Sequence, residues 1–173
     1  MTAQVSDSLT FEGRNFSLSC EPLMGWLYRR KNRKDKALRF SVKSSNCWRG
    51  YVAEWEISRG RLYLTSIKGK LADGSDATSS ALFKNYSSQY LDSLGANDPA
   101  NAGPGTFAFW VSGWMSYSFG QLLSYAHMGY GGIYEGQLFL LMKEGFLVGQ
   151  QIVHRQAADL GDAEQLRPHR LRW

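Results

Sequence analysis

Two carboxylates on one stretch of the chain are the clearest candidates for chemistry. Glu54 and Glu56 lie in the segment CWRGYVAEWEIS, where apolar and polar residues alternate as they do in a β-strand. Two residues along a strand separate the Cα atoms by about 6.6–7 Å on one face, which is near the separation of paired acid/base carboxylates. The same pair is also ordinary on the solvent face of a hairpin, where Lys or Arg on the next strand neutralises it. A catalytic and a structural interpretation both stay open.

The glycine-rich segment HMGYGGIYEG, residues 127–136, is the second candidate. Its glycines permit close backbone approach to a ligand, and His127, Tyr130, Tyr134 and Glu135 would supply polar groups. It does not match the dinucleotide pattern G-x-G-x-x-G, because Tyr134 stands where the third glycine belongs and strand-like sequence follows. It is also typical of a bulged crossover that lets a strand enter a sheet. We expect either that crossover or a site where Tyr130, Tyr134 and Glu135 face a partner.

Arg49, beside Trp48, is the third candidate. A guanidinium can stack on an aromatic ring or bind a carboxylate through two parallel hydrogen bonds. The alternative is a packed side chain whose charged end reaches solvent.

Metal and cofactor motifs are missing from the sequence. It contains no phosphate-binding loop, no G-x-S-x-G, no H-E-x-x-H and no EF-hand spacing. His127, His154 and His169 are far apart, and Cys20 and Cys47 form no C-x-x-C pair. We therefore expect no metal site and no cofactor, and two reduced, partly buried cysteines.

Basic residues gather in two places. The net charge is +5, with one run at Arg29–Lys36 and three arginines in residues 167–173. This excess predicts an acidic partner. Nucleic acid is possible, through Arg29, Arg30, Lys31, Arg33 and Lys34. Cations at the end of a helix also suit its dipole, so the run has a structural explanation too.

Hairpins dominate the elements that must position these residues. We predict a hairpin with its turn at Glu12-Gly13, and then a helix that begins at Pro22. A longer hairpin covers residues 47–67. A two-residue turn at Arg59-Gly60 would place Leu62 opposite Ile57 and Leu64 opposite Trp55, which gives one apolar face.

The second half of the chain predicts one helix and another hairpin. Ser80–Gly95 has apolar residues at helical spacing with Ser80 as cap, and Thr106–Gly120 resembles a strand. Ile133–Arg155 predicts a hairpin with its turn at residues 143–145, covered on both faces because its apolar runs do not alternate. Residues 121–128 fit a helix or a strand, and residues 157–166 predict a marginal helix.

Together these elements predict an α+β fold: a single domain over residues 1–173, with a mostly antiparallel sheet built from hairpins and two or three short helices. A chain of this length with 43% hydrophobic and 14% aromatic residues can bury one core. We expect residues 1–8 and 156–173 to be peripheral. No apolar run approaches the roughly 20 residues of a membrane span, and the N-terminus does not resemble a signal peptide, so we expect a cytoplasmic protein.

Three segments resemble a family of small, uncharacterised bacterial proteins. They are Trp48–Tyr51 with Trp55–Ile57, the Leu-Tyr-Leu of residues 62–64, and His127–Glu135. The resemblance extends over about Phe11 to Val148, omitting the loops, and carries no catalytic residues with it. It implies, by association, an immunity partner of a bacterial toxin.

The leading hypothesis is therefore a non-enzymatic binding protein, and more narrowly an immunity (antitoxin) protein that blocks a toxin by direct contact. Many Trp and Tyr residues suit such an interface. One alternative is a small enzyme in which Glu54, Glu56, His127 and Glu135 converge, with Arg49 binding an anionic substrate. The other is a nucleic-acid-binding protein.

Overall fold

The computed structural model describes residues 3–31, 39–42, 44–84, 86–125, 130 and 132–156, and only the backbone of residues 29–31. Its elements along the chain are β1 (Ser8–Phe11), β2 (Arg14–Ser17), α1 (Pro22–Lys31), β3 (Tyr51–Ser58), β4 (Arg61–Gly69), α2 (Ser79–Phe83), α3 (Ser88–Ser93), a 3-10 turn η2 (Pro99–Asn101), β5 (Thr106–Phe107), β6 (Gly113–Ser124), β7 (Ile133–Lys143) and β8 (Phe146–His154).

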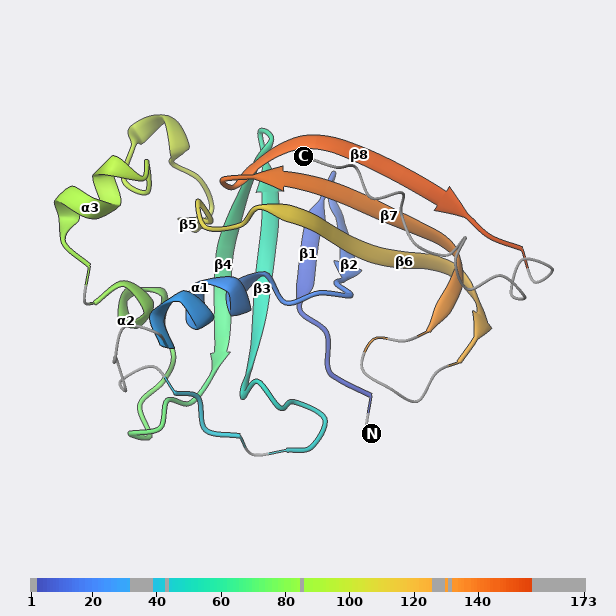
Figure 1. Cartoon of the computed structure of the whole chain (residues 1–173), viewed down its shortest axis with the longest axis horizontal. Coiled ribbons are helices and arrows are strands. Elements are labelled where there is room, and N and C mark those ends of the chain that lie inside the picture. The colour runs from blue at the N-terminus through green and yellow to red at the C-terminus, as the bar shows by residue number, and fades with distance from the viewer. Residues whose placement is uncertain are drawn as a thin grey trace.

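Eight strands form one sheet, which confirms the predicted α+β class. The strand order is β2-β1-β3-β4-β8-β7-β6, and β5 pairs with β4 off this path. Every pairing is antiparallel except that of β1 with β3. The three helices lie beside β4, at one end of the molecule (Figure 1).

The sheet folds back on itself around the core. The β6–β8 strands cross over the β1–β4 strands (Figure 1). At one junction β4 and β8 pair only at Arg61 with Phe146. At the other, Leu18, just after β2, bridges to Tyr117 of β6, and Ser19 N–H donates to the Ser116 carbonyl at 2.8 Å. The two ends of the strand order therefore meet, and the enclosed side chains form the core.

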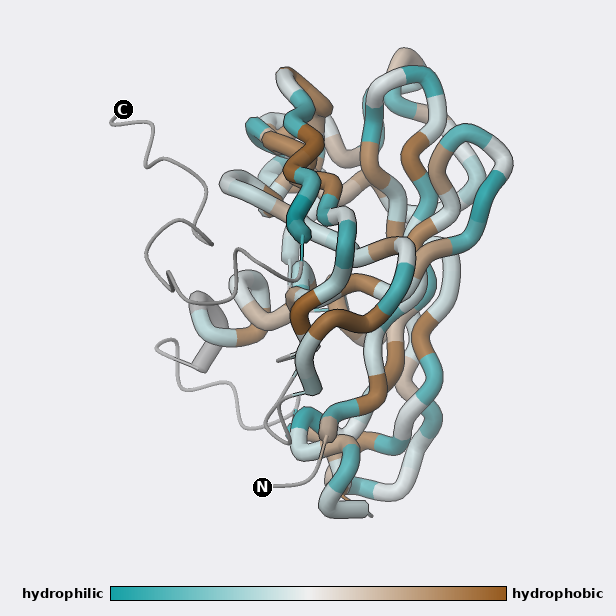
Figure 2. Tube along the Cα trace, turned by 90° about the vertical axis from the view of Figure 1, so that its right-hand side faces the viewer, coloured by the Kyte–Doolittle hydropathy of each residue, from teal (hydrophilic) through white to brown (hydrophobic). Residues whose placement is uncertain are grey.

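The predicted hairpin turns are confirmed at both early positions. Glu12-Gly13 and Arg59-Gly60 have positive φ at both residues, as a type I′ turn requires. The predicted register also holds, with Trp55 opposite Leu64 and Ile57 opposite Leu62. The alternation of β3 is complete, since every second residue from Tyr51 is buried. Figure 2 shows the same alternation of hydrophobic and hydrophilic positions along the strands.

The last hairpin differs from its prediction in two ways. Its turn is the two-residue Glu144-Gly145, because Lys143 already pairs with Phe146. β7 lies inside the sheet, but β8 is exposed at six of its nine positions, so the expectation that both strands are covered on both faces is wrong for β8. Residues 121–124, which fitted either element, belong to strand β6. The helix predicted for residues 157–166 lies outside the described residues.

The single helix predicted for Ser80–Gly95 is wrong. Two short helices stand there instead, and each has its own N-cap. Thr78 Oγ1 accepts from Ala81 N–H at 3.2 Å, and Ser87 Oγ accepts from Tyr90 N–H at 3.2 Å. Ser87 has extended backbone angles, so it begins a new helix and cannot continue the first.

Aromatic rings fill the space between the helices and the sheet. Trp26 of α1 is 3% exposed and lies within 5.4 Å, between ring centroids, of four other aromatic residues. These four are Phe83, Tyr86, Phe109 and Trp110. Cys20 and Cys47 are free and half-buried, as predicted.

Two glycine substitutions test the turn and the helix. Gly60 has φ +73° and Gly25 lies in α1, and an added Cβ would meet no atom within 4 Å at either position. Sterics are thus matched, and only the backbone conformation differs. Gly60→Ala should lower the free energy of unfolding by about 1 kcal/mol or more, whereas Gly25→Ala should raise it by up to about 1 kcal/mol. Urea unfolding measures both; equal effects would contradict the assigned turn.

Candidate functional site

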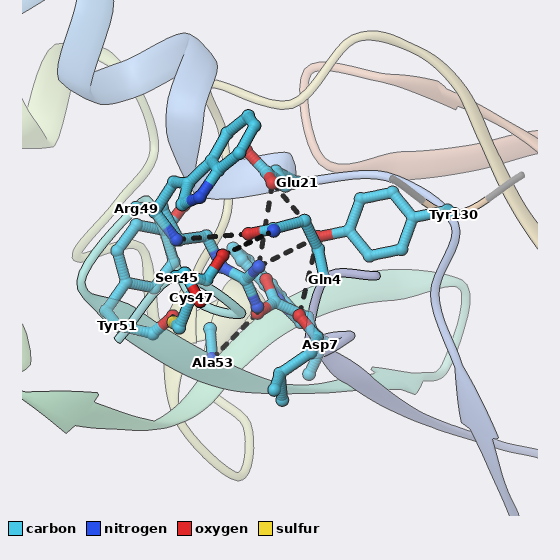
Figure 3. A network of polar contacts seen from close by, with 12 residues as sticks. Gln4, Asp7, Glu21, Ser45, Cys47, Arg49, Tyr51, Ala53 and Tyr130 are labelled. Carbon is cyan, nitrogen blue, oxygen red and sulfur yellow. Dashed lines mark hydrogen bonds and ion pairs between the residues drawn. The ribbon is translucent and has the colours of Figure 1, made fainter. Parts of the chain in front are cut away.

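Arg49 does not face an external ligand, because it is buried in an ion pair with Asp7. Its Nη2 lies 2.7 Å from Asp7 Oδ1, and the two side chains are 2% and 0% exposed. The guanidinium also lies 5.2 Å from the centroid of the Tyr51 ring. Figure 3 shows this pair at the centre of a polar network between β3 and the N-terminal segment.

Asp7 connects the N-terminal segment to β3. Its carboxylate accepts from Ala53 N–H at 2.9 Å and from the Trp55 indole N–H at 3.1 Å, besides Arg49. Burial raises the pKa of Asp7, while these hydrogen bonds and the charge of Arg49 act in the opposite direction. The carboxylate accepts every hydrogen bond that it makes, which is the pattern of an ionised acid. The sequence indicated no role for Asp7, and the segment that we expected to be peripheral thus contains a fully buried residue.

Tyr130, from the glycine-rich segment, completes the network. Its hydroxyl accepts from Arg49 Nη1 at 2.8 Å and donates to Glu21 Oε1 at 2.9 Å. Glu21 in turn lies 3.5 Å from Arg49 Nη1. Burial, first of all, raises the pKa of the Tyr130 phenol. The segment therefore sends one polar side chain inward, to a structural network. Glu21, like Asp7, was missed, because an acid near a helix start has no distinctive pattern.

The predicted carboxylates have separate surroundings. Glu54 and Glu56 lie on the face of β3 opposite the core, and Glu54 forms an ion pair with Lys68 of β4. Glu135 Oε2 accepts from Gln121 N–H at 2.9 Å and lies over Gly120, where β6 is irregular. Tyr134 pairs with Leu122 in the β6–β7 ladder.

The contacts bring Arg49 and Tyr130 together, and they join neither residue to Glu54, Glu56 or Glu135. His127 lies outside the described residues, as do Arg33 and Lys34. Within the described ranges, no three His, Cys, Asp or Glu side chains gather as a metal site requires. In the same part of the chain, no helix combines the length and the apolar character needed to cross a membrane.

Two hollows lie away from all these residues. One, of about 390 Å³, is between the β1–β2 turn and β8 and includes Phe11, Tyr117, Gln150, Ile152 and His154. The other, of about 430 Å³, lies between α3 and the turn that joins β7 to β8. Its aromatic lining comes from four separate stretches of sequence, so no local motif could have predicted it.

Comparison with known proteins gave no match to a family model, to a curated protein or to a solved structure.

Substitution of Asp7 tests the network. Asp7→Asn removes the nearer and fully buried of the two carboxylates beside the guanidinium, and should lower the free energy of unfolding by about 3–5 kcal/mol. Glu54→Gln is the control. It breaks an ion pair whose side chains are 40% and 70% exposed, and should cost at most about 1 kcal/mol.

A double-mutant cycle distinguishes the interaction energy between Asp7 and Arg49 from the energetic effect of burying each side chain. If Asp7 and Arg49 stabilise each other, the double variant Asp7→Leu/Arg49→Met should lose less than the sum of the single losses, by about 1 kcal/mol or more. Additive losses in urea unfolding would contradict the ion pair.

Proposed function

We propose that this chain is a non-enzymatic binding protein whose partner is another protein, and that the partner docks on strand β8. The proposal rests on β8, a strand that has both exposed apolar side chains and an unpaired backbone edge. Phe146, Val148 and Ile152 are 38%, 54% and 55% exposed.

Strand β8 is paired along one edge and largely unpaired along the other. β7 pairs with β8 along its length, whereas β4 pairs with it only at Phe146. Leu147 N–H donates to the Gly60 carbonyl at 2.8 Å, and among the described residues no strand pairs with the other edge of β8 from 148 to 154. A strand with such an edge offers backbone N–H and C=O groups to a further strand.

An apolar hollow lies beside β8. Ile152 lines it together with Phe11, Phe16 and Tyr117. An extended partner segment that pairs with β8 would place alternate side chains toward this hollow. Main-chain hydrogen bonds would supply affinity and the hollow would supply specificity, as in strand-addition complexes.

The engaged charges support binding rather than catalysis. Arg49 is held by Asp7, Glu54 by Lys68, and Glu135 by the backbone of Gln121. An acid/base mechanism needs such groups directed together at a substrate. The enzyme hypothesis therefore has little support from these contacts.

The narrower hypotheses stay predictions. An immunity protein would use β8 to hold a toxin, and the product of the adjoining gene is the partner to try first. Nucleic-acid binding through the basic run would weaken steeply as salt rises, which a titration with duplex and single-stranded DNA measures.

Lysine substitutions test β8. Val148→Lys/Ile152→Lys should weaken binding to the product of the adjoining gene at least tenfold, equivalent to about 1.4 kcal/mol, because charge on a strand edge opposes pairing. Val42→Lys, at a valine that is 56% exposed and outside β8, should bind like the wild type. Surface plasmon resonance gives the Kd values.

Hydrogen exchange gives a second measurement, since pairing of a partner strand should protect amides within residues 148–154. If the adjoining gene product does not bind, the immunity hypothesis fails. If it binds equally well to the lysine variant, the β8 site is wrong.

A further inference from the structure

The hollow between α3 and the β7–β8 turn has the composition of a ligand site. Its volume of about 430 Å³ falls within the range of small-molecule pockets. Seven aromatic residues line it: Trp26, Tyr86, Tyr90, Phe107, Phe109, Trp110 and Phe146. The partner-binding surface proposed above meets it only at Phe146, so the two proposals stand on different observations.

The lining rings pack against one another at several angles. Phe109 is perpendicular to both Trp26 and Trp110, at 90° each, with centroid distances of 5.3 and 5.2 Å. Tyr86 and Tyr90 stack instead, at 24° and 5.5 Å. Four of the rings are nearly buried in this packing, and Tyr90 and Phe146, which are 41% and 38% exposed, are the accessible rings of the lining.

The charge of the lining has one sign. Glu144 is its only carboxylate, and the described lining residues include no Lys, Arg or His. Glu144 is exposed at the β7–β8 turn, and among the described residues its carboxylate makes no hydrogen bond or ion pair. Its backbone N–H donates to Ser112 Oγ at 2.9 Å, which holds the turn against the pocket.

One lining ring already contacts a cation. The guanidinium of Arg61 lies 5.4 Å from the centroid of Phe146, and Arg61 Nε donates to Asn101 Oδ1 at 2.9 Å. Arg61 is not itself a lining residue. Its charge opposes a second cation at the Phe146 ring, which leaves the other lining rings and Glu144 for a ligand.

We propose that this pocket binds a small organic cation with an alkylated ammonium group. The faces of aromatic rings are negative and attract such cations, and Glu144 supplies the counter-charge. The pocket offers an anion neither a basic side chain nor a long helix terminus. A quaternary ammonium has no N–H to satisfy, so it suits walls that are mostly carbon.

The experiment compares choline with 3,3-dimethyl-1-butanol, its neutral isostere, by isothermal titration calorimetry on the full chain. The two have the same shape, so any difference reports the charge. We expect choline to bind at least about tenfold more tightly. A short peptide that carries trimethyllysine forms a parallel arm, and tighter binding there would identify a protein as the source of the ammonium group.

Variants locate the site. Tyr90→Leu and Glu144→Gln should each weaken choline binding at least about fivefold. Tyr90 is 41% exposed, so its loss should leave the fold intact, and thermal unfolding checks this. Matched controls are Tyr28→Leu, at a tyrosine that is 58% exposed and outside the pocket, and Glu56→Gln; both should bind choline like the wild type.

Indole N–H resonances give an independent readout, because Trp26 and Trp110 line the pocket and Trp48 does not. Choline should shift the first two and leave Trp48 unmoved. The proposal is overturned if neither cation binds below about 10 mM, a limit that corresponds to about 2.7 kcal/mol. It is also overturned if the neutral isostere binds equally well, or if both variants bind like the wild type.

Discussion

The buried contact between Asp7 and Arg49 is the constraint on which the arrangement of the chain depends. A carboxylate and a guanidinium removed from water cost several kcal/mol each unless they meet each other and further hydrogen-bond partners. Asp7 accepts from Arg49, Ala53 and Trp55. Arg49 donates to Asp7 and Tyr130, while its buried Nε has no hydrogen-bond partner among the described residues. The network fixes β1 beside β3 in parallel, whereas the other pairings are antiparallel. It also brings Tyr130 into contact with Glu21 and Arg49, which lie far from it in the sequence.

The residues that stabilise the fold are different from those on the surfaces that we propose for binding. Of the described candidate residues, Arg49 and Tyr130 lie in the buried network, Glu54 pairs with Lys68, and Glu135 accepts from the Gln121 backbone. Two surface features stand outside this network: strand β8, which exposes Phe146, Val148 and Ile152, and the aromatic pocket around Trp26 and Tyr90. Surfaces of that kind discriminate by shape and by the charge of the ligand.

Local patterns predicted the hairpins well. Alternation along Tyr51–Ser58 and the Arg59-Gly60 turn determined the β3–β4 register, because a slip of one residue would turn Trp55 to solvent. Tertiary features were harder to predict. Asp7 lies 42 residues from Arg49, and no spacing rule joins them. The prediction of one helix over residues 80–95 was wrong because Ser87 is the N-cap of a second helix. Whether a serine caps a new helix or continues an existing one depends on its local hydrogen bonds, which hydrophobic periodicity does not detect. The aromatic pocket unites residues from Trp26 to Phe146, and only folding brings them together.

The parallel pairing of β1 with β3 has a consequence for synthesis. The first hairpin emerges from the ribosome with Asp7 already in place, but its partners on β3 follow more than forty residues later. Until then the acid must remain hydrated, and the hairpin gains nothing by burying it. Until Arg49 has been synthesised, the N-terminal residues are therefore undocked, and proteases and chaperones can reach them. Contacts of such long range close slowly, and the bridge between Leu18 and Tyr117, which spans even more of the chain, can form only after β6 has been synthesised.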